Sequence, residues 1–168
     1  MDIIRIIDTG KQELALQNRS RLTPIIDAIL VCGIQGIALR GHRDSGAIFD
    51  NDNNNNDGNL RAILRNRSLG DPILRDNLLN CSKNATYLSL IIQNEIIDAC
   101  NKLILITTCT NERTFSNLRR LKTYLQSNTS ESRLNGLALL NIHRDLVPTT
   151  NEILDTLATF PRKLKITL

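Results

Sequence analysis

Leucine and isoleucine recur every three or four residues through most of the chain, and this spacing constrains the fold more than any other feature. Together they supply 48 of the 168 residues, whereas valine supplies 2 and tryptophan is absent. Such spacing lines one face of an α-helix, and the shortage of valine and aromatic residues disfavours an all-β sandwich. No apolar run approaches the roughly 20 residues that cross a bilayer. We therefore expect a mainly α fold with no membrane partner.

Three helices are expected in the first half of the chain. The apolar pattern over residues 12–39 predicts a helix in two pieces, because Thr23-Pro24 is a typical helix start and Gly41 follows its expected end. A short helix is predicted at about 59–67. Asp71-Pro72 predicts the start of a third helix.

Four further helices are expected after these. Ser89 can cap a helix over roughly 89–106, although its tail from Leu103 to Ile106 is also compatible with a strand. Helices are predicted from Thr110 or Asn111 to about 127 and from Glu131 to about 144, and the second of these is apolar over more than one face, which predicts burial on two sides. Thr149 and Glu152 have the spacing of a capping box that opens the last helix.

Residues 50–59 are asparagine, aspartate and glycine without one apolar side chain, which predicts a disordered loop. The composition is similar to that of a calcium-binding loop, but Arg61 stands where the twelfth position needs a glutamate. The cysteines and histidines are too far apart in sequence to predict a metal site. We expect Cys32, Cys81, Cys100 and Cys109 to be buried free thiols, and no cofactor.

The positive charge of the chain belongs to its last third. Residues 1–100 carry a net charge of −1, whereas residues 101–168 carry +5. The candidate nucleic-acid contacts are Arg113, Arg119, Arg120 and Lys122. A solvated or ion-paired helix face is an equally good reading of this cluster.

Two stretches of the chain resemble the C-terminal dimerisation region of hAT-family transposases. They are Thr107–Leu125, which contains Asn-Glu-Arg-Thr-Phe-Ser, and Arg133–Asp145. Earlier segments at 33–44, 84–87 and 92–100 resemble the same family, in particular the zinc finger MYM-type protein 1 group and the repressor of the inhibitor of the protein kinase group. In these proteins such segments belong to a domain of unknown function that leads into an RNase H-like fold.

The resemblance implies a division into a helical segment over 1–100, with the Asn/Asp-rich loop at 50–59, and a dimerisation domain over 107–168. It also implies a large deletion, because several hundred residues separate the segments around Cys100 and Glu112 in the family. The chain is thus expected to consist of helical fragments flanking a missing RNase H-like core.

The deleted part would hold two of the three catalytic carboxylates, and the resemblance aligns Glu112 with the third. Two-metal chemistry needs all three, so we expect no metal site and no enzyme activity, with Glu112 at most vestigial. The alternative reading of Glu112 is a residue of a first helical turn. Asp98 and Asp145 lie where the family places no catalytic group, and His42 and His143 read as loop and helix-end residues.

The function expected from these observations is non-catalytic dimerisation, with a second copy or related hAT-derived proteins as partners and no small-molecule substrate. The predicted interface residues are Phe115, Leu118, Leu121, Leu125, Leu134, Leu137 and Leu140. The resemblance implies a nuclear location, and without it the chain would be expected in the cytoplasm. The alternatives are a residual transposase-like DNA-binding protein and a non-functional truncated transposon product.

Overall fold

The computed structural model describes residues 3–42, 44, 46–49, 56–80, 87–107 and 131–160. These residues form six α-helices and one 3-10 turn, and none of them lies in a β-strand, so the mainly α prediction is confirmed. The elements are α1 (Ile3–Gln35), α2 (Asn59–Arg67), α3 (Pro72–Asn80), α4 (Leu90–Thr107), α6 (Glu131–Ile142), η1 (Arg144–Leu146) and α7 (Thr150–Ala158).

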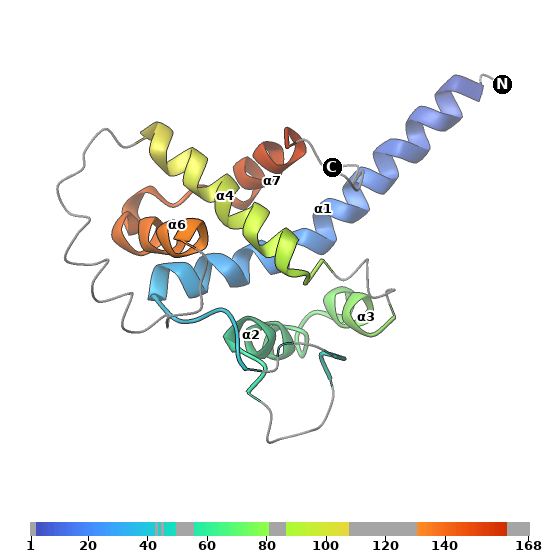
Figure 1. Ribbon diagram of the computed structural model, residues 1–168. Helices are drawn as coiled ribbons and strands as arrows, with labels where there is room; N and C mark the ends of the chain where they lie inside the picture. The colour runs from blue at the N-terminus through green and yellow to red at the C-terminus, as the bar shows by residue number, and fades with distance from the viewer. Residues whose placement is uncertain are drawn as a thin grey trace.

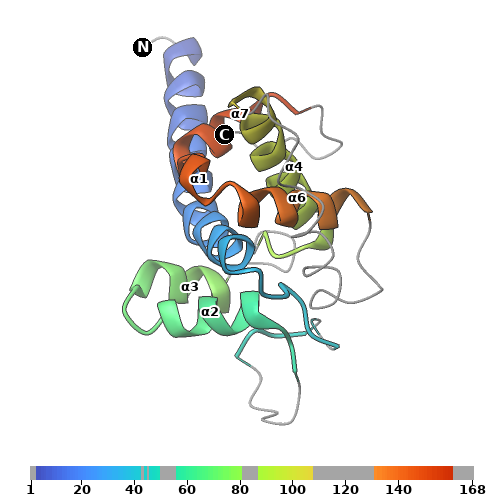
Figure 2. The same ribbon diagram turned by 90° about the vertical axis from the view of Figure 1, so that its left-hand side faces the viewer.

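The long helix α1 packs against each of the other five α-helices of the described residues. Helices α2 and α3 pack on one side of its C-terminal half, whereas α4, α6 and α7 pack together on the other side (Figures 1 and 2). The N-terminal part of α1 extends beyond the other helices in both views. Helix α1 therefore packs against both groups of helices.

Pro24 lies inside α1, so the prediction of two helical pieces is wrong. The Thr23 hydroxyl does not cap a new helix but donates a hydrogen bond to the Arg19 carbonyl, 2.9 Å away and one turn earlier. Proline removes one helical hydrogen bond, which weakens a helix locally. Here Leu22, Pro24 and Ile25 are all buried, and tertiary packing keeps the helix continuous across the missing bond.

Helix α1 ends at Gln35, earlier than the predicted end near residue 39. Gly36 has a φ of 67°, which places it in the left-handed region that glycine adopts without strain. The Ile37 amide donates to the Cys32 carbonyl (3.0 Å) and the Gly36 amide to the Gly33 carbonyl (3.1 Å). This pair of bonds is the Schellman arrangement, which satisfies the last carbonyls of the helix.

Three predicted helix starts are confirmed by their hydrogen bonds. The Leu74 amide donates to Asp71 Oδ1 (2.9 Å), and the Ile92 amide donates to Ser89 Oγ (3.3 Å). At α7 the Glu152 amide donates to Thr149 Oγ1 (3.3 Å), and the Thr149 amide donates to Glu152 Oε2 (2.7 Å). The capping box is therefore complete.

Other predicted ranges are confirmed with small changes. The short helix α2 spans the predicted range, so its first residue, Asn59, belongs to a helix and not to the Asn/Asp-rich loop. The stretch from Leu103 to Ile106 continues α4 and is not a strand. Helix α6 ends at Ile142, two residues before the predicted end, and the chain then forms the turn η1.

A charged cluster holds the segment between α1 and α2 against α2. The buried Arg61 guanidinium donates to the carbonyls of Asp44, Gly46 and Ala47 at 2.8–3.1 Å. Asp57 accepts from Arg61 Nε (3.0 Å) and from both terminal nitrogens of Arg65. Asp57 belongs to the predicted disordered loop, of which residues 50–55 lie outside the described residues.

The described part of the chain shares one hydrophobic core. Its fully buried side chains come from α1 (Ile26, Ile29), α2 (Leu64), α4 (Ile96, Ile104), α6 (Leu140) and α7 (Ile153). The sequence left open whether the segments before and after residue 107 pack together. In the structure α6 and α7 pack on α1 and α4, so they do.

Candidate interaction surface

Helix α6 lies between α1 and α4 and approaches both of them closely at glycines. A Cβ on Gly33 of α1 would lie 2.7 Å from Leu140 Cδ1. A Cβ on Gly136 would collide with Ile97 and Asn101 of α4. These absent side chains let the three helix backbones approach, so the position of α6 is set on two sides.

The predicted burial of this helix on two sides is confirmed, and its partners are helices of the same chain. Leu137 is 3% exposed and Leu140 is 0% exposed, while Leu134 is half-buried. Leu137 and Leu140 therefore belong to the core of one copy. They are available to a second copy only when α6 leaves its place between α1 and α4.

The other predicted site residues lie outside the described residues. These are the interface residues Phe115, Leu118, Leu121 and Leu125, the candidate nucleic-acid contacts Arg113, Arg119, Arg120 and Lys122, and Glu112. The predicted helix from residue 110 or 111 to 127 lies there as well. Their roles stay predictions.

The structure places the remaining candidate polar residues on separate elements. Asp98 is half-buried on α4, and Asp145 is exposed in η1. His42 is exposed in the segment after α1, and His143 follows α6, where its amide donates to the Leu139 carbonyl (2.9 Å). Across residues 3–42 and the other described ranges, no three His, Cys, Asp or Glu side chains gather in a way that could hold a metal ion.

Cys32 and Cys100 are buried free thiols, as predicted. Burial raises the pKa of Cys32 to about 11 and that of Cys100 to about 12. Both thiols are therefore protonated at neutral pH, when they pack as small apolar groups. Cys81 and Cys109 lie outside the described residues.

Sequence reasoning missed three buried polar atoms on α4 and α6 that have no hydrogen-bond partner. Arg133 of α6 is only 9% exposed, and its Nε has no hydrogen-bond partner. Asn94 Oδ1 and Asn101 Oδ1 of α4 are also buried without a partner. The available signal was a basic residue in a helix expected to be buried on two sides.

Two family comparisons match the chain. Residues 2–118, more than two thirds of the chain, match the family described as ZMYM1/FAM200, RNase-like domain. Residues 103–146 match the hAT family C-terminal dimerisation region, which includes the end of α4 together with α6 and η1. No curated protein and no solved structure matches the chain significantly.

The searched part of the chain contains no helix with the length and apolar content needed to span a membrane. The family matches agree with the motifs around Thr107–Leu125 and Arg133–Asp145 and with the segments before residue 101. Together they establish that the chain belongs to the ZMYM1/FAM200 RNase-like domain family and carries a hAT C-terminal dimerisation region.

Proposed function

We propose that the chain is a non-catalytic dimerisation module whose partner is a second copy or a related hAT-derived protein. The observation that carries the proposal is the match of residues 103–146 to the hAT dimerisation region. Helix α6 supplies most of the described residues of this region. The mechanism of dimerisation therefore has to account for the burial of α6.

We infer that dimerisation exchanges α6 between two copies. In this arrangement α6 of one copy packs on α1 and α4 of the other and reproduces the contacts that Leu137 and Leu140 make within one copy. Exchange of an identical element costs little, because the same interface is formed. The 23 residues between Thr107 and Glu131 can span at most roughly 80 Å, which is ample for one crossing, and the short connection from Ile142 to Thr150 means that α7 crosses together with α6.

A disulfide between α1 and α6 shows whether α6 packs on its own chain or on the chain of the second copy. Gly33→Cys and Leu140→Cys suit this test, because an ideal Cβ on Gly33 lies 3.1 Å from Leu140 Cβ, and a small outward shift of α6 would bring the two atoms into the disulfide range of roughly 3.5–4.5 Å. The four native cysteines are first replaced by alanine. With exchange, oxidation links two chains, and a non-reducing gel shows a covalent dimer. The Gly33→Cys variant alone is the control and gives no α1–α6 crosslink.

Sedimentation of the unmodified full chain separates the two parts of the proposal. A dimer whose engineered disulfide stays within one chain contradicts exchange and leaves dimerisation standing. A chain that sediments as a monomer across micromolar concentrations contradicts dimerisation itself.

The non-catalytic part rests on the sequence, in which Glu112 is the single carboxylate at a position that aligns with the catalytic set. Strand cleavage by the purified chain with Mn²⁺ or Mg²⁺ would contradict it. DNA binding through Arg113, Arg119, Arg120 and Lys122 is the alternative function, and it predicts a gel shift that weakens steeply as salt rises. Nuclear location is a prediction that a fluorescent fusion tests.

A further inference from the structure

The strongest unexplained feature of the molecule is the buried charge of Arg133. Its side chain is nine-tenths buried, its Nε has no partner, and no hydrogen bond or ion pair to it is found in the described part of the chain. An unpaired buried charge is destabilising, because the protein does not replace the hydration that the ion has in water. Among the described residues, Arg133 therefore has no carboxylate within ion-pair distance.

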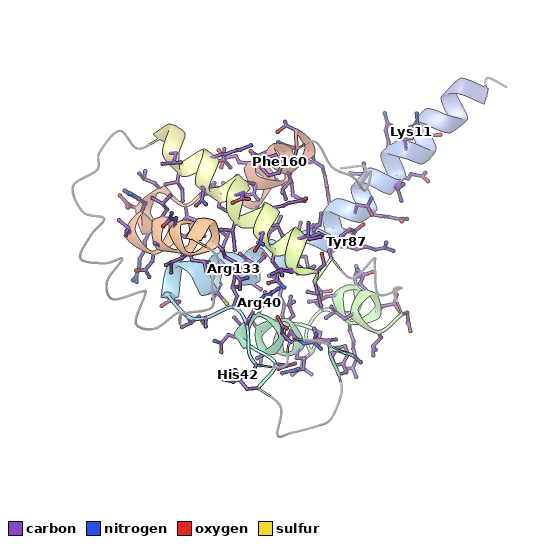
Figure 3. All side chains as sticks on the ribbon, in the orientation of Figure 1. Lys11, Arg40, His42, Tyr87, Arg133 and Phe160 are labelled. Atoms are coloured by element: carbon purple, nitrogen blue, oxygen red, sulfur yellow. The ribbon has the colours of Figure 1, made fainter. Side chains whose placement is uncertain are left out.

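A second arginine faces Arg133 from the segment after α1. Figure 3 shows Arg40 and Arg133 near one another beside α4. Arg40 Nε lies 3.2 Å from Asp44 Oδ2 and 3.4 Å from Gln93 Oε1. The pKa of Arg133 is lowered, first by burial and then by the charge of Arg40, while Asp44 opposes this effect. Asp44, the carboxylate whose charge acts on Arg133, is thus engaged by Arg40.

We propose that Arg40 and Arg133 bind a phosphate group. Each guanidinium presents a planar fork of N–H donors that matches the oxygens of a phosphate, and a phosphate offers more acceptors and more charge than a single carboxylate. The side chains of Arg40 and Asp44 are 26% and 33% exposed, so the pair is open to solvent on that side. This site goes beyond dimerisation and does not depend on it.

The phosphate can come from two sources with the same chemistry, a free phosphate and the phosphodiester of DNA. The test measures the melting temperature of the full chain at constant ionic strength, with inorganic phosphate in one series and a short DNA duplex in another. A ligand that binds the folded state raises the melting temperature. Phosphate also stabilises proteins generally, so the signal is the difference between variants.

Four variants test whether phosphate binding depends on the Arg133 side chain. Arg133→Met should melt no lower than the wild type without ligand, because it removes an unpaired buried charge, and it should weaken phosphate binding by about tenfold or more. Arg133→Lys keeps the charge without the planar fork and should bind with intermediate affinity. Asp44→Asn removes the competing carboxylate and should tighten binding. Arg144→Gln is the control, because it removes one exposed positive charge near the other end of α6.

The two ligand series identify the source. An Arg133-dependent shift with inorganic phosphate assigns a free phosphate, and a shift with the duplex alone assigns a phosphodiester. The proposal is overturned when neither ligand shifts the wild type, or when Arg133→Met responds as the wild type does. It is also overturned when Arg133→Met melts well below the wild type in buffer alone, since Arg133 then has a structural role.

Discussion

Asp57 is the residue on which the charged cluster beside α2 depends. Its carboxylate accepts from Arg65 and Arg61, and Arg61 in turn holds the carbonyls of Asp44, Gly46 and Ala47. The Arg65 hydrogen bonds lower the pKa of Asp57, with a smaller contribution from Arg61. The contribution of Asp57 to the free energy of unfolding is therefore fully present above the unfolded pKa of about 3.9. It is lost as the pH falls below that value towards the folded pKa.

We expect Asp57→Asn to lower the free energy of unfolding by about 3 kcal/mol at pH 7, because it leaves the partly buried arginines without their anion. The difference from the wild type should shrink as the pH falls below about 4 towards the lowered folded pKa of Asp57, because the folded carboxylate then becomes protonated too. Urea unfolding at several pH values measures this. Asp76→Asn, at an exposed site on α3, is the control and should change stability by less than about 0.5 kcal/mol. An equal loss in both variants would contradict the role of the cluster.

Gly136 is the residue that sets the distance between α6 and α4. Ala is about 1 kcal/mol better than Gly in a helix, but a Cβ at Gly136 would collide with Ile97 and Asn101. We expect Gly136→Ala to be destabilising by about 1 kcal/mol after both effects, because overpacking costs about 1–3 kcal/mol. Gly10→Ala is the matched control: nothing lies within 4 Å of that site, so it should be stabilising. Thermal melts of the two variants check the opposite signs.

At the scale of the element, helix α7 depends on its capping box. Thr149 and Glu152 satisfy each other's backbone amides, and the Thr149 bonds lower the pKa of Glu152. We expect Thr149→Ala to lower the free energy of unfolding by about 1 kcal/mol, since the Glu152 amide loses the hydroxyl that accepts its hydrogen bond. Thr156→Ala is the control, because its hydroxyl bonds only to the Glu152 carbonyl within the helix. Equal effects of the two changes in chemical denaturation would contradict this.

Helix α1 has two halves with different support. Residues 9–14, 16 and 17 are exposed, whereas Leu22, Ile25, Ile26 and Ile29 are almost fully buried. Isolated helical turns are marginal in water, so most helix stability comes from packing. We expect amide hydrogen exchange to be faster over residues 9–17 than over 22–32. Equal protection in both halves of a monomeric sample would contradict this expectation.

At the scale of the molecule, the shared core predicts that the segments before and after residue 107 unfold together. Leu140 of α6 is fully buried against α1, so Leu140→Ala should cost about 3 kcal/mol and lower the melting of the whole chain in one transition. Leu69→Ala is the control, because Leu69 is 75% exposed. Two separate melting transitions in the wild type would contradict a single cooperative core.

The same packing changes how dimerisation can be tested. Leu137→Asp and Leu140→Asp place charges in the core of one copy, so they would unfold the chain as well as block association. The disulfide between Gly33→Cys and Leu140→Cys places no charge in the core, although it shortens the buried Leu140 side chain, and it reports which copy supplies α6.

Local sequence signals are enough to predict the helical class and most helix starts. Asp71, Ser89 and Thr149 lie next to the amides that they cap, so their signals are local and need no tertiary contact. The apolar pattern of α6 likewise predicted burial on two sides. The predicted break at Pro24 is wrong because the cost of one missing hydrogen bond is small beside the burial of its neighbours. The predicted end of the helix is too late because the stretch holds Gly33, Gly36 and Gly41, and the sequence does not indicate which of them adopts the left-handed conformation.

The elements that cover α6 and the surroundings of Arg133 depend on tertiary packing. The apolar spacing of Leu137 and Leu140 requires burial but does not say whether the partner is the same chain or another, because both give the same free energy of burial. The structure places α1 and α4 of the same chain there. It also brings Arg40 and Arg133 together across 93 positions of sequence, and no local pattern encodes such a juxtaposition.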